Sequence, residues 1–303
     1  MTVSLESIQT FLFVVIRAAT PFIFVALAAV ISHQAGLINL SIESMALTAA
    51  LVGVLVSGYT QNLWIAFLCG VISSMAIAGI LCFASFYLKV NIPLMSIALN
   101  TAVSGATIFI MFVLTGSKAN TSTTIPSLVF PQIDLPLIEN IPFLGKVLSG
   151  HNLLTYLAFI MVFAVWFLVY KTTLGLRIRA IGQNPKAAEA VGINVNRLKT
   201  VSFLLSAVVA SLCGMYMSMG YVQWFARDMV AGRGFIGISA STIAGASPVG
   251  ATLASFVFTF AYVVNTYLRL DNIDANLVSA IPYALSFALL NVFSVIRLKK
   301  RQP

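Results

Sequence analysis

Residues 171–199 read KTTLGLRIRAIGQNPKAAEAVGINVNRLK, a polar stretch that stands between long apolar runs on either side. Six of these residues are Lys or Arg and only one, Glu189, is acidic. A run of about 20 apolar residues is long enough to cross a bilayer as a helix, and loops rich in Lys and Arg stay on the cytoplasmic side. The stretch therefore predicts a protein that crosses a membrane several times, with residues 171–199 as a cytoplasmic loop.

The composition supports a membrane protein throughout the chain. Of the 303 residues, 60% are hydrophobic and 8% are charged, whereas about 25% are charged in a typical soluble domain. No segment is long and polar enough for a separate soluble domain, so we expect residues 1–303 to form a single transmembrane domain. The net charge of +9 does not indicate nucleic-acid binding, because ten of the 17 basic residues lie in the 171–199 loop and in the tail at Arg297, Lys299, Lys300 and Arg301.

Hydropathy predicts an all-α transmembrane bundle with about nine crossings. The apolar runs lie at about residues 11–31, 40–58, 63–88, 93–115, 152–170, 200–220, 234–248, 250–270 and 276–296. Nine crossings place the two termini on opposite sides, and the basic tail then places the C-terminus in the cytoplasm and the N-terminus outside. Residues 116–150 form an outer loop in which four prolines prevent a long helix, although a short one can fit.

Two runs of small residues indicate an inverted repeat. Residues 36–46 read GLINLSIESMA and residues 234–244 read GFIGISASTIA, and a gap-free alignment pairs Ser41 with Ser239. In the predicted topology the first run enters the membrane from inside and the second from outside, so crossings 1–4 are related to crossings 6–9 around crossing 5. Interrupted segments at equivalent places in two halves indicate broken helices beside a substrate path near the midplane.

A few polar residues near these runs are candidates for the substrate path, together with the two serines. Glu43 is the sole acid within the first four crossings, and two interpretations stay open. It is either a functional intramembrane carboxylate or a carboxylate that stabilises a helix N-terminus at the wet cytoplasmic end. Asn39 precedes it and is placed to cap that helix. Arg233, between two glycines, is a candidate gate or anchor at a backbone bend.

The 171–199 loop contains the signature of a short capped helix. Asn184 is a preferred N-cap, Pro185 suits the first helical position and Gly192 suits a left-handed stop. Between them lie helix formers and one acid, at Ala187, Ala188 and Glu189. Because a short helix in a basic loop has little reason to exist for packing alone, we expect it to dock a cytoplasmic partner.

The sequence offers no catalytic chemistry. No phosphate-binding loop of the GxxxxGK[ST] type occurs, and no triad or carboxylate pair can be assembled from so few polar groups. His33 and His151 are isolated from other metal-ligating residues, and the three cysteines fall in apolar runs without CxxC spacing. We therefore expect neither an enzyme nor a cofactor or metal site in this chain.

Together these motifs resemble the membrane permease subunits of bacterial ABC importers. The loop fits the pattern G-x-N-P-x-A-A-x-x-x-G-I-x-V from Gly182 to Val195, and the runs GLINLSIESMAL and AGRGFIGISASTIAGASPVGATLASFVF strengthen the likeness. The family is the branched-chain amino acid, ribose and nucleoside group, and the likeness, nearest to the nucleoside and simple-sugar type, covers about residues 20 to 296. Nucleoside-type members usually have S-E-R-A-G where this chain has SHQAG at residues 32–36, so the substrate stays open.

The resemblance implies a larger machine with a permease fold of the vitamin-B12-importer type. It implies two permease subunits, identical or homologous, and an ATP-binding subunit that docks under each coupling loop and binds the ATP. It also implies an extracytoplasmic substrate-binding protein and a location in the cytoplasmic membrane of a bacterium.

The class of substrate follows from the polarity of the predicted path. A path poor in fixed charge favours a neutral polar solute, a nucleoside ahead of a simple sugar, with a branched-chain amino acid as a further alternative. A rival of a different class is an ion-coupled secondary transporter that uses Glu43, and the capped cytoplasmic helix argues against it. A second rival is a non-transporting scaffold, against which the broken helices argue.

Overall fold

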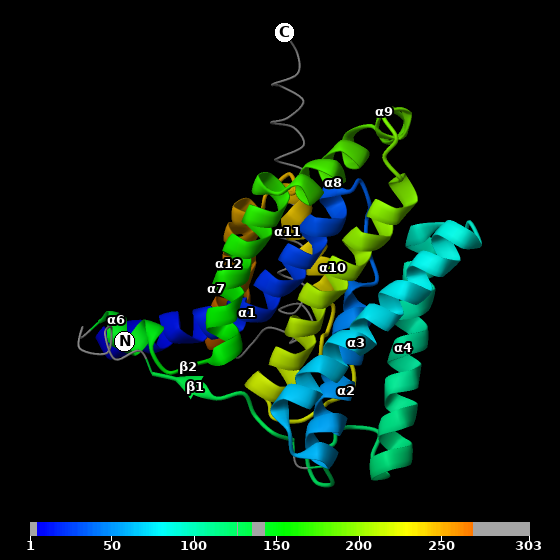
Figure 1. Ribbon diagram of the computed structural model, residues 1–303. Helices are drawn as coiled ribbons and strands as arrows, with labels where there is room; N and C mark the ends of the chain where they lie inside the picture. The colour runs from blue at the N-terminus through cyan, green and yellow to red at the C-terminus, as the bar shows by residue number, and fades with distance from the viewer. Residues whose placement is uncertain (1–4, 126, 135–142, 269–303) are drawn as a thin grey trace.

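The computed structural model describes residues 5–125, 127–134 and 143–268, and these are mostly helical (Figure 1). The long helices are α1 (Leu5–Gln34), α2 (Ile42–Thr60), α3 (Leu63–Cys82), α4 (Ile92–Thr115), α7 (Leu153–Lys171), α10 (Val195–Tyr216) and α12 (Pro248–Leu268). The shorter elements are α6 (Leu144–Leu148), α8 (Thr173–Gln183), α9 (Pro185–Ala190), α11 (Arg233–Ile243), the π-helical turns η1 (Phe83–Tyr87) and η2 (Met217–Tyr221), and the strands β1 (Gln132–Ile133) and β2 (His151–Asn152). In this part of the chain six helices are long and apolar enough to cross a membrane, as in a polytopic membrane protein.

The described helices confirm the first six predicted crossings, whereas the seventh predicted crossing contains only a short helix. Each predicted run up to residue 220 coincides with a long apolar helix. The run at 234–248 contains α11, which has 11 residues and is about 16 Å long, roughly half the thickness of the hydrocarbon core. The non-helical residues 222–232 precede it. The run at 276–296 lies outside the described residues, so the count of nine stays a prediction.

Helices α1 and α10 form the centre of the bundle and run antiparallel (Figure 1). The Ser206 hydroxyl donates to the Ala28 carbonyl and the Tyr216 hydroxyl donates to the Arg17 carbonyl, each at 2.8 Å. Every residue of α1 from 19 to 32 is buried, because α1 packs on α11 and α12 as well as on α10. In the same way α10 packs on α2 and α3. The two central helices therefore have matching sets of neighbours.

Glycines let α2 and α11 approach these central helices closely. A Cβ atom at Gly214 of α10 would collide with the backbone carbonyl of Ala46 in α2. A Cβ atom at Gly237 of α11 would lie 2.7 Å from the backbone of Val25 in α1. Glycine avoids both collisions, and small residues are the usual means by which membrane helices come close together. The result fixes α2 on α10 and α11 on α1.

The helices α2 and α11 run in opposite directions, as an inverted repeat requires. Along α2 and α10 the contacts run from Ala46–Gly214 to Gly53–Met219, so the residue numbers rise together. Along α1 and α11 they run from Val25–Gly237 to Gln34–Ala246, and the numbers again rise together. Helix α2 is therefore parallel to α10, and α11 is parallel to α1. Because α1 and α10 are antiparallel, the two halves of the bundle are oppositely oriented.

The register of this repeat differs from the gap-free alignment. Residues 36–41 are non-helical, whereas residues 234–239 lie within α11. Ser41 precedes its helix and Ser239 is the seventh residue of its own, so the pairing of these two serines is wrong. Packing instead makes Ala46 equivalent to Gly237, each the fifth residue of its helix. The alignment failed because short runs of Gly, Ser and Ile look alike whether they precede a helix or form one.

The loop between α4 and α7 covers the end of the bundle opposite α9 (Figure 1). It carries the short helix α6, as the sequence allows, and a small antiparallel pair in which β1 faces β2. The Thr121 N–H donates to the Phe225 carbonyl and the Phe130 N–H donates to the Met219 carbonyl. The loop is therefore attached to η2 and to the non-helical segment 222–232.

Candidate functional site

Glu43 lies where α2 and the short helix α11 begin. It is the second residue of α2, and its carboxylate accepts two backbone hydrogen bonds from the start of α11. The Gly232 N–H donates to Oε1 at 2.7 Å and the Gly234 N–H donates to Oε2 at 2.8 Å. The N-terminus of a helix carries a partial positive charge, which a carboxylate stabilises. One acid therefore serves the starts of two helices.

This junction lies inside the bundle, away from the end that carries α8 and α9. Asn39, four residues before Glu43, donates from Nδ2 to the Ser206 hydroxyl at 3.1 Å. Ser206 is the twelfth residue of α10, about 16 Å along that helix from its first residue. Residues 35–41 lead the chain back into the bundle before α2 begins, which is why Glu43 does not lie at the end where α1 finishes.

Asn39 and Ser41 form a buried polar network beneath this junction. The N–H and the hydroxyl of Ser41 both donate to Asn39 Oδ1, at 3.1 and 2.7 Å. Asn39 was expected to cap α2, but the N-cap is Ser41, whose side chain makes no capping bond. The reason is that Asn39 bonds to the backbone two residues ahead, as asparagine does in turns. Both side chains are buried, so they hold residues 35–41 in place.

Arg233 anchors the bend before α11. Its Nη1 donates to the carbonyls of Met229 and Val230 at 3.2 and 3.0 Å, and its guanidinium lies over the Phe22 ring at 5.6 Å from the centroid. Gly232 has φ +76°, a left-handed conformation that glycine adopts without steric cost. The guanidinium therefore holds its own segment, and a role of Arg233 as a gate or anchor on the path stays a prediction.

The outward face of α11 combines an aromatic ring with hydroxyl groups. Phe235 is 42% exposed, Ser239 is half-buried and Thr242 is exposed. These residues are four and three positions apart, so they share one face of the helix. The Ser239 hydroxyl donates back to the Phe235 carbonyl at 3.1 Å. Of this face the sequence analysis named Ser239 alone, because exposure within a small-residue run leaves no local signal.

Helix α4 supplies polar contacts that the sequence analysis missed. Asn100 Nδ2 donates to the Leu40 carbonyl at 2.9 Å, and the Ser44 N–H donates to Asn100 Oδ1 at 3.2 Å. One turn further along α4, the Ser104 hydroxyl donates to Asp228 Oδ1 at 2.6 Å. Helix α4 therefore holds both non-helical segments. Two polar residues four positions apart in an apolar run were the available signal.

The loop at 171–199 folds as its capping signature predicts. Asn184 Oδ1 accepts the Ala187 N–H at 3.1 Å, Pro185 is the first residue of α9, and Gly192 has φ +83°. Ala188 is buried, whereas Pro185, Ala187 and Glu189 are exposed. The short helix therefore presents most of its surface at the end of the bundle (Figure 1).

A second helix, α8, precedes α9 and joins it to the rest of the bundle. The sequence analysis missed it, although Thr172 caps it by accepting the Gly175 N–H at 3.0 Å. A Cβ atom on Gly36 would lie 3.1 Å from the Gly182 Cα and carbonyl oxygen, so α8 touches the turn that follows α1. Movement of α8 and α9 would therefore act directly on residues 35–41.

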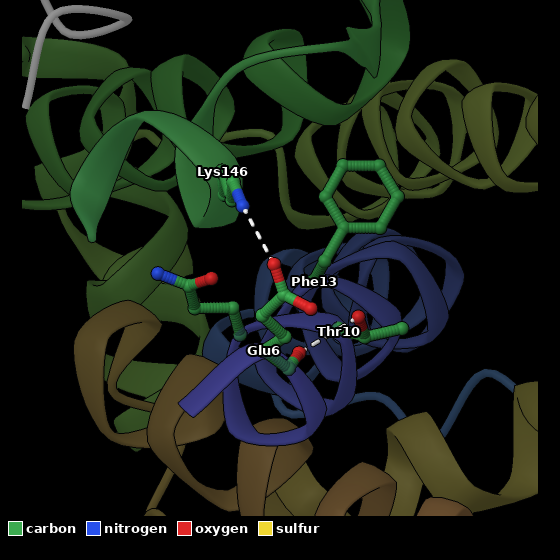
Figure 2. Close-up of a pocket in the computed structure, with 5 residues that line it drawn as sticks. Glu6, Thr10, Phe13 and Lys146 are labelled. Carbon is green, nitrogen blue, oxygen red and sulfur yellow. Dashed lines mark hydrogen bonds and ion pairs between the residues drawn. The ribbon is translucent and has the colours of Figure 1, made fainter. Parts of the chain in front are cut away.

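The opposite end of the molecule has a hollow beside α6 (Figure 2). It is lined by Glu6, Gln9, Thr10 and Phe13 of α1 and by Lys146 of α6. Lys146 Nζ lies 3.4 Å from Glu6 Oε1, and both side chains are exposed. An exposed pair of this kind contributes little to stability. The hollow is therefore a surface feature in which both charges stay accessible.

The architecture is that of a polytopic helical membrane protein with an exposed loop helix. A family model described as the permease component of the branched-chain amino acid transport system matches residues 11–293. The chain belongs to this family of ABC transporter permeases. Its members are membrane subunits rather than enzymes, and the family implies ATPase and substrate-binding partners.

Several curated proteins are similar along most of the chain. NupQ, a guanosine ABC transporter permease of Bacillus subtilis, is 30% identical over 80% of this chain and 77% of its own, and NupC, a nucleoside permease of Lactococcus lactis, is 26% identical over 91% and 89%. TsgC13 of Haloferax volcanii, named as a glucose ABC transporter permease, is 29% identical over 80% and 73%. The solved structure of PsaBC from Streptococcus pneumoniae in complex with Fab matches with TM-score 0.54 and 14% identity over 93% of this chain and 89% of that chain, a likeness of fold alone.

Proposed function

We propose that this chain is the membrane-spanning subunit of an ATP-driven importer for a nucleoside. The observation that carries the proposal is the capped helix α9, which is exposed at the end of the bundle and joined through α8 to the non-helical segment 35–41 that precedes α2. Similarity to guanosine and nucleoside permeases supports the substrate class. The face of α11 with Phe235, Ser239 and Thr242 suits a neutral solute that has both an aromatic base and hydroxyl groups.

The assembly around the chain follows from the same proposal. Two permease subunits, identical or homologous, would form the path, an ATP-binding subunit would dock on residues 184–192 of each, and an extracytoplasmic binding protein would deliver the solute near the α6 end. ATP would bind to the partner, and this chain would need no cofactor. Residues 1–303 would form one domain with nine crossings in the cytoplasmic membrane of a bacterium, with a fold of the vitamin-B12-importer type.

The proposed mechanism uses contacts between the loop and the junction. Closure of the ATPases would displace α9 and α8, and the backbone contact between Gly182 and Gly36 would pass this displacement to residues 35–41. Asn39 and Glu43 connect that segment to α10 and to the start of α11. The helices α2 and α11 would then open the path to one side and close it to the other, as rigid elements do in switching proteins.

An ion-coupled transporter is the second candidate, because Glu43 is an acid inside the bundle. Both carboxylate oxygens already accept backbone N–H groups, so Glu43 has a structural role that needs no coupled ion. A simple sugar or a branched-chain amino acid is the alternative substrate within the same class, since the TsgC13 name refers to glucose.

The test is uptake into vesicles that contain the permease with its ATPase and binding protein. We expect ATP-dependent uptake of a nucleoside and not of a pentose or leucine. Gly192→Val should lower both ATPase docking and uptake, because φ +83° strains a β-branched residue. Gly105→Ala is the matched control, since a Cβ atom there meets nothing within 4 Å. Uptake driven by a proton gradient without ATP would overturn the class, and leucine-only uptake would overturn the substrate.

A further inference from the structure

Helix α11 begins without a capping side chain of its own. Its N-cap is Gly232, which has no side chain to accept an N–H group, and the first N–H groups of a helix lack partners within that helix. Leaving such groups unpaired in apolar surroundings is costly. Ordinary helices solve this with Ser, Thr, Asp or Asn at the N-cap. Here the acceptor comes from Glu43, 189 positions earlier along the chain.

The same place is unusually crowded, which shows how closely the two helix starts meet. A Cβ atom on Gly234 would lie 2.8 Å from Glu43 Oε2 and 2.9 Å from the Glu43 backbone nitrogen. Glu43 and Gly234 are each the second residue of their helix, so they are equivalent in the observed register of the repeat. The carboxylate therefore lies where the two oppositely directed halves come together.

The other contacts near the start of α11 come from different directions. Arg233 bonds to carbonyls of its own segment, and Asp228 accepts from Ser104 of α4. Glu43 provides the two bonds that join this start to α2. If they are lost, α11 keeps its contact with α1 through Gly237, but its first turn is held to α2 by packing alone, without these two hydrogen bonds.

We propose that Glu43 is the positioning residue of the transport path, a two-point latch that holds the first turn of α11 against the first turn of α2. Glu43 acts through α11, because it keeps the face of α11 that carries Phe235 and Ser239 in place. The carboxylate links a segment that enters from one side of the bundle with a segment that enters from the other. The latch therefore joins α2 to α11, so that in the proposed mechanism the two helices move together. The effect of the latch on uptake rests on the proposed function, whereas its effect on hydrogen exchange does not.

The structural test is hydrogen exchange in the assembled complex without substrate. In Glu43→Gln one acceptor oxygen is replaced by an NH₂ group that faces an N–H donor, so we expect the peptide that covers residues 229–237 to exchange at least about tenfold faster. Gly234→Ala should have the same effect, because its methyl group would lie 2.8 Å from Glu43 Oε2 and 2.9 Å from the Glu43 backbone nitrogen and so separates the two helix starts. Gly79→Ala, in α3, is the matched control and should change neither exchange nor uptake, because a Cβ atom there meets nothing within 4 Å.

The functional test separates positioning from folding. We expect Glu43→Gln and Gly234→Ala to lower the maximal uptake rate while ATPase docking on α9 is retained. The double variant should lose less than the product of the two single losses, because both break one interaction. Unchanged exchange in Glu43→Gln, faster exchange with normal uptake, or fully multiplicative losses would each overturn the latch. If the wild-type protein fails to import any nucleoside, the proposed function fails, and the exchange result still decides whether the latch exists.

Discussion

At the scale of single residues, the sequence indicated what kind of role the Glu43 carboxylate has, but it did not indicate which groups the carboxylate contacts. An acid near the beginning of a predicted helix indicates either a functional carboxylate or a stabilised N-terminus. The structure shows it on the N-terminal groups of a second helix, at Gly232 and Gly234. The second interpretation assigned Glu43 to the N-terminus of its own helix. Only the packing of the other half decides which N–H groups it meets.

His151 gives a prediction at this scale. It lies in β2, outside the crossings, where it is buried, its Nε2 is 2.9 Å from the Val147 carbonyl and its ring stacks on Phe13. Burial lowers its pKa below the ordinary value, and the positive charge of Arg17 acts in the same direction, whereas the contact with the Val147 carbonyl opposes both. Below about pH 6.5 the unfolded chain therefore binds a proton that the folded protein binds less readily.

The expected result is that the free energy of unfolding falls as the pH drops through and below about 6.5. Thermal unfolding of the purified protein between about pH 8 and pH 5 measures this, with His151→Gln as the comparison. The variant should lose part of the slope below pH 6.5 while the slope from all other groups stays. Parallel curves for the two proteins would show that His151 does not contribute.

At the scale of elements, the long helix α1 contains a proline that leaves one backbone carbonyl without its usual donor. Pro21 lies inside α1 and has no N–H to donate to the Arg17 carbonyl one turn earlier. The Tyr216 hydroxyl of α10 donates to that carbonyl at 2.8 Å. A neighbouring helix thus satisfies the backbone group that proline leaves free, as is required inside a membrane. Pro21 of α1 and Tyr216 of α10 are therefore linked through the Arg17 carbonyl.

This arrangement predicts a specific coupling between two substitutions. Tyr216→Phe should destabilise the protein by about 1 kcal/mol, because the Arg17 carbonyl loses its donor. Pro21→Ala supplies a new N–H within α1, so it should gain more stability in the Tyr216→Phe background than in the wild type. Denaturation of the four proteins gives the coupling energy.

The comparison uses a half-buried tyrosine bond. Tyr156 donates to the Leu148 carbonyl at 2.8 Å, and not to the carbonyl that Pro21 leaves free. Pro21→Ala should therefore have the same effect in Tyr156→Phe as in the wild type. Equal effects of Pro21→Ala in all three backgrounds would contradict the account of Tyr216.

At the scale of the whole molecule, the two ends of the bundle have different character. One end carries α8 and α9 with most of the basic loop, and the other carries α6, β1 and β2 (Figure 1). The bias of Lys and Arg predicts that the α9 end is cytoplasmic. The orientation therefore depends on charge, whereas the separation of the two ends depends on packing.

Labelling of single cysteines tests this orientation. Lys186→Cys on α9 and Ser122→Cys in the outer loop are both at exposed positions. In a background without the natural cysteines, an impermeant maleimide added to intact cells should label position 122, and position 186 only after the membrane is opened. Labelling of both from one side, or the reverse pattern, would contradict the predicted topology.

The sequence by itself determined the features that depend on neighbouring residues. The apolar runs up to residue 220 became crossings because length and hydropathy suffice for a helix in a bilayer. The short helix α9 formed as expected because Asn184 and Gly192 satisfy its ends locally. The family resemblance was confirmed for the same reason, since its motifs are contiguous.

The tertiary structure alone decided how the two halves meet. The register of the repeat, the depth of Glu43, the contacts of Asn100 and Ser104, and the bond from Tyr216 to α1 all join residues far apart in the chain. Hydropathy cannot predict these contacts, because the hydropathy value of a small or polar residue is the same whether it faces lipid or another helix. In the folded protein, buried backbone groups must find partners wherever packing brings them, and that requirement selected these contacts.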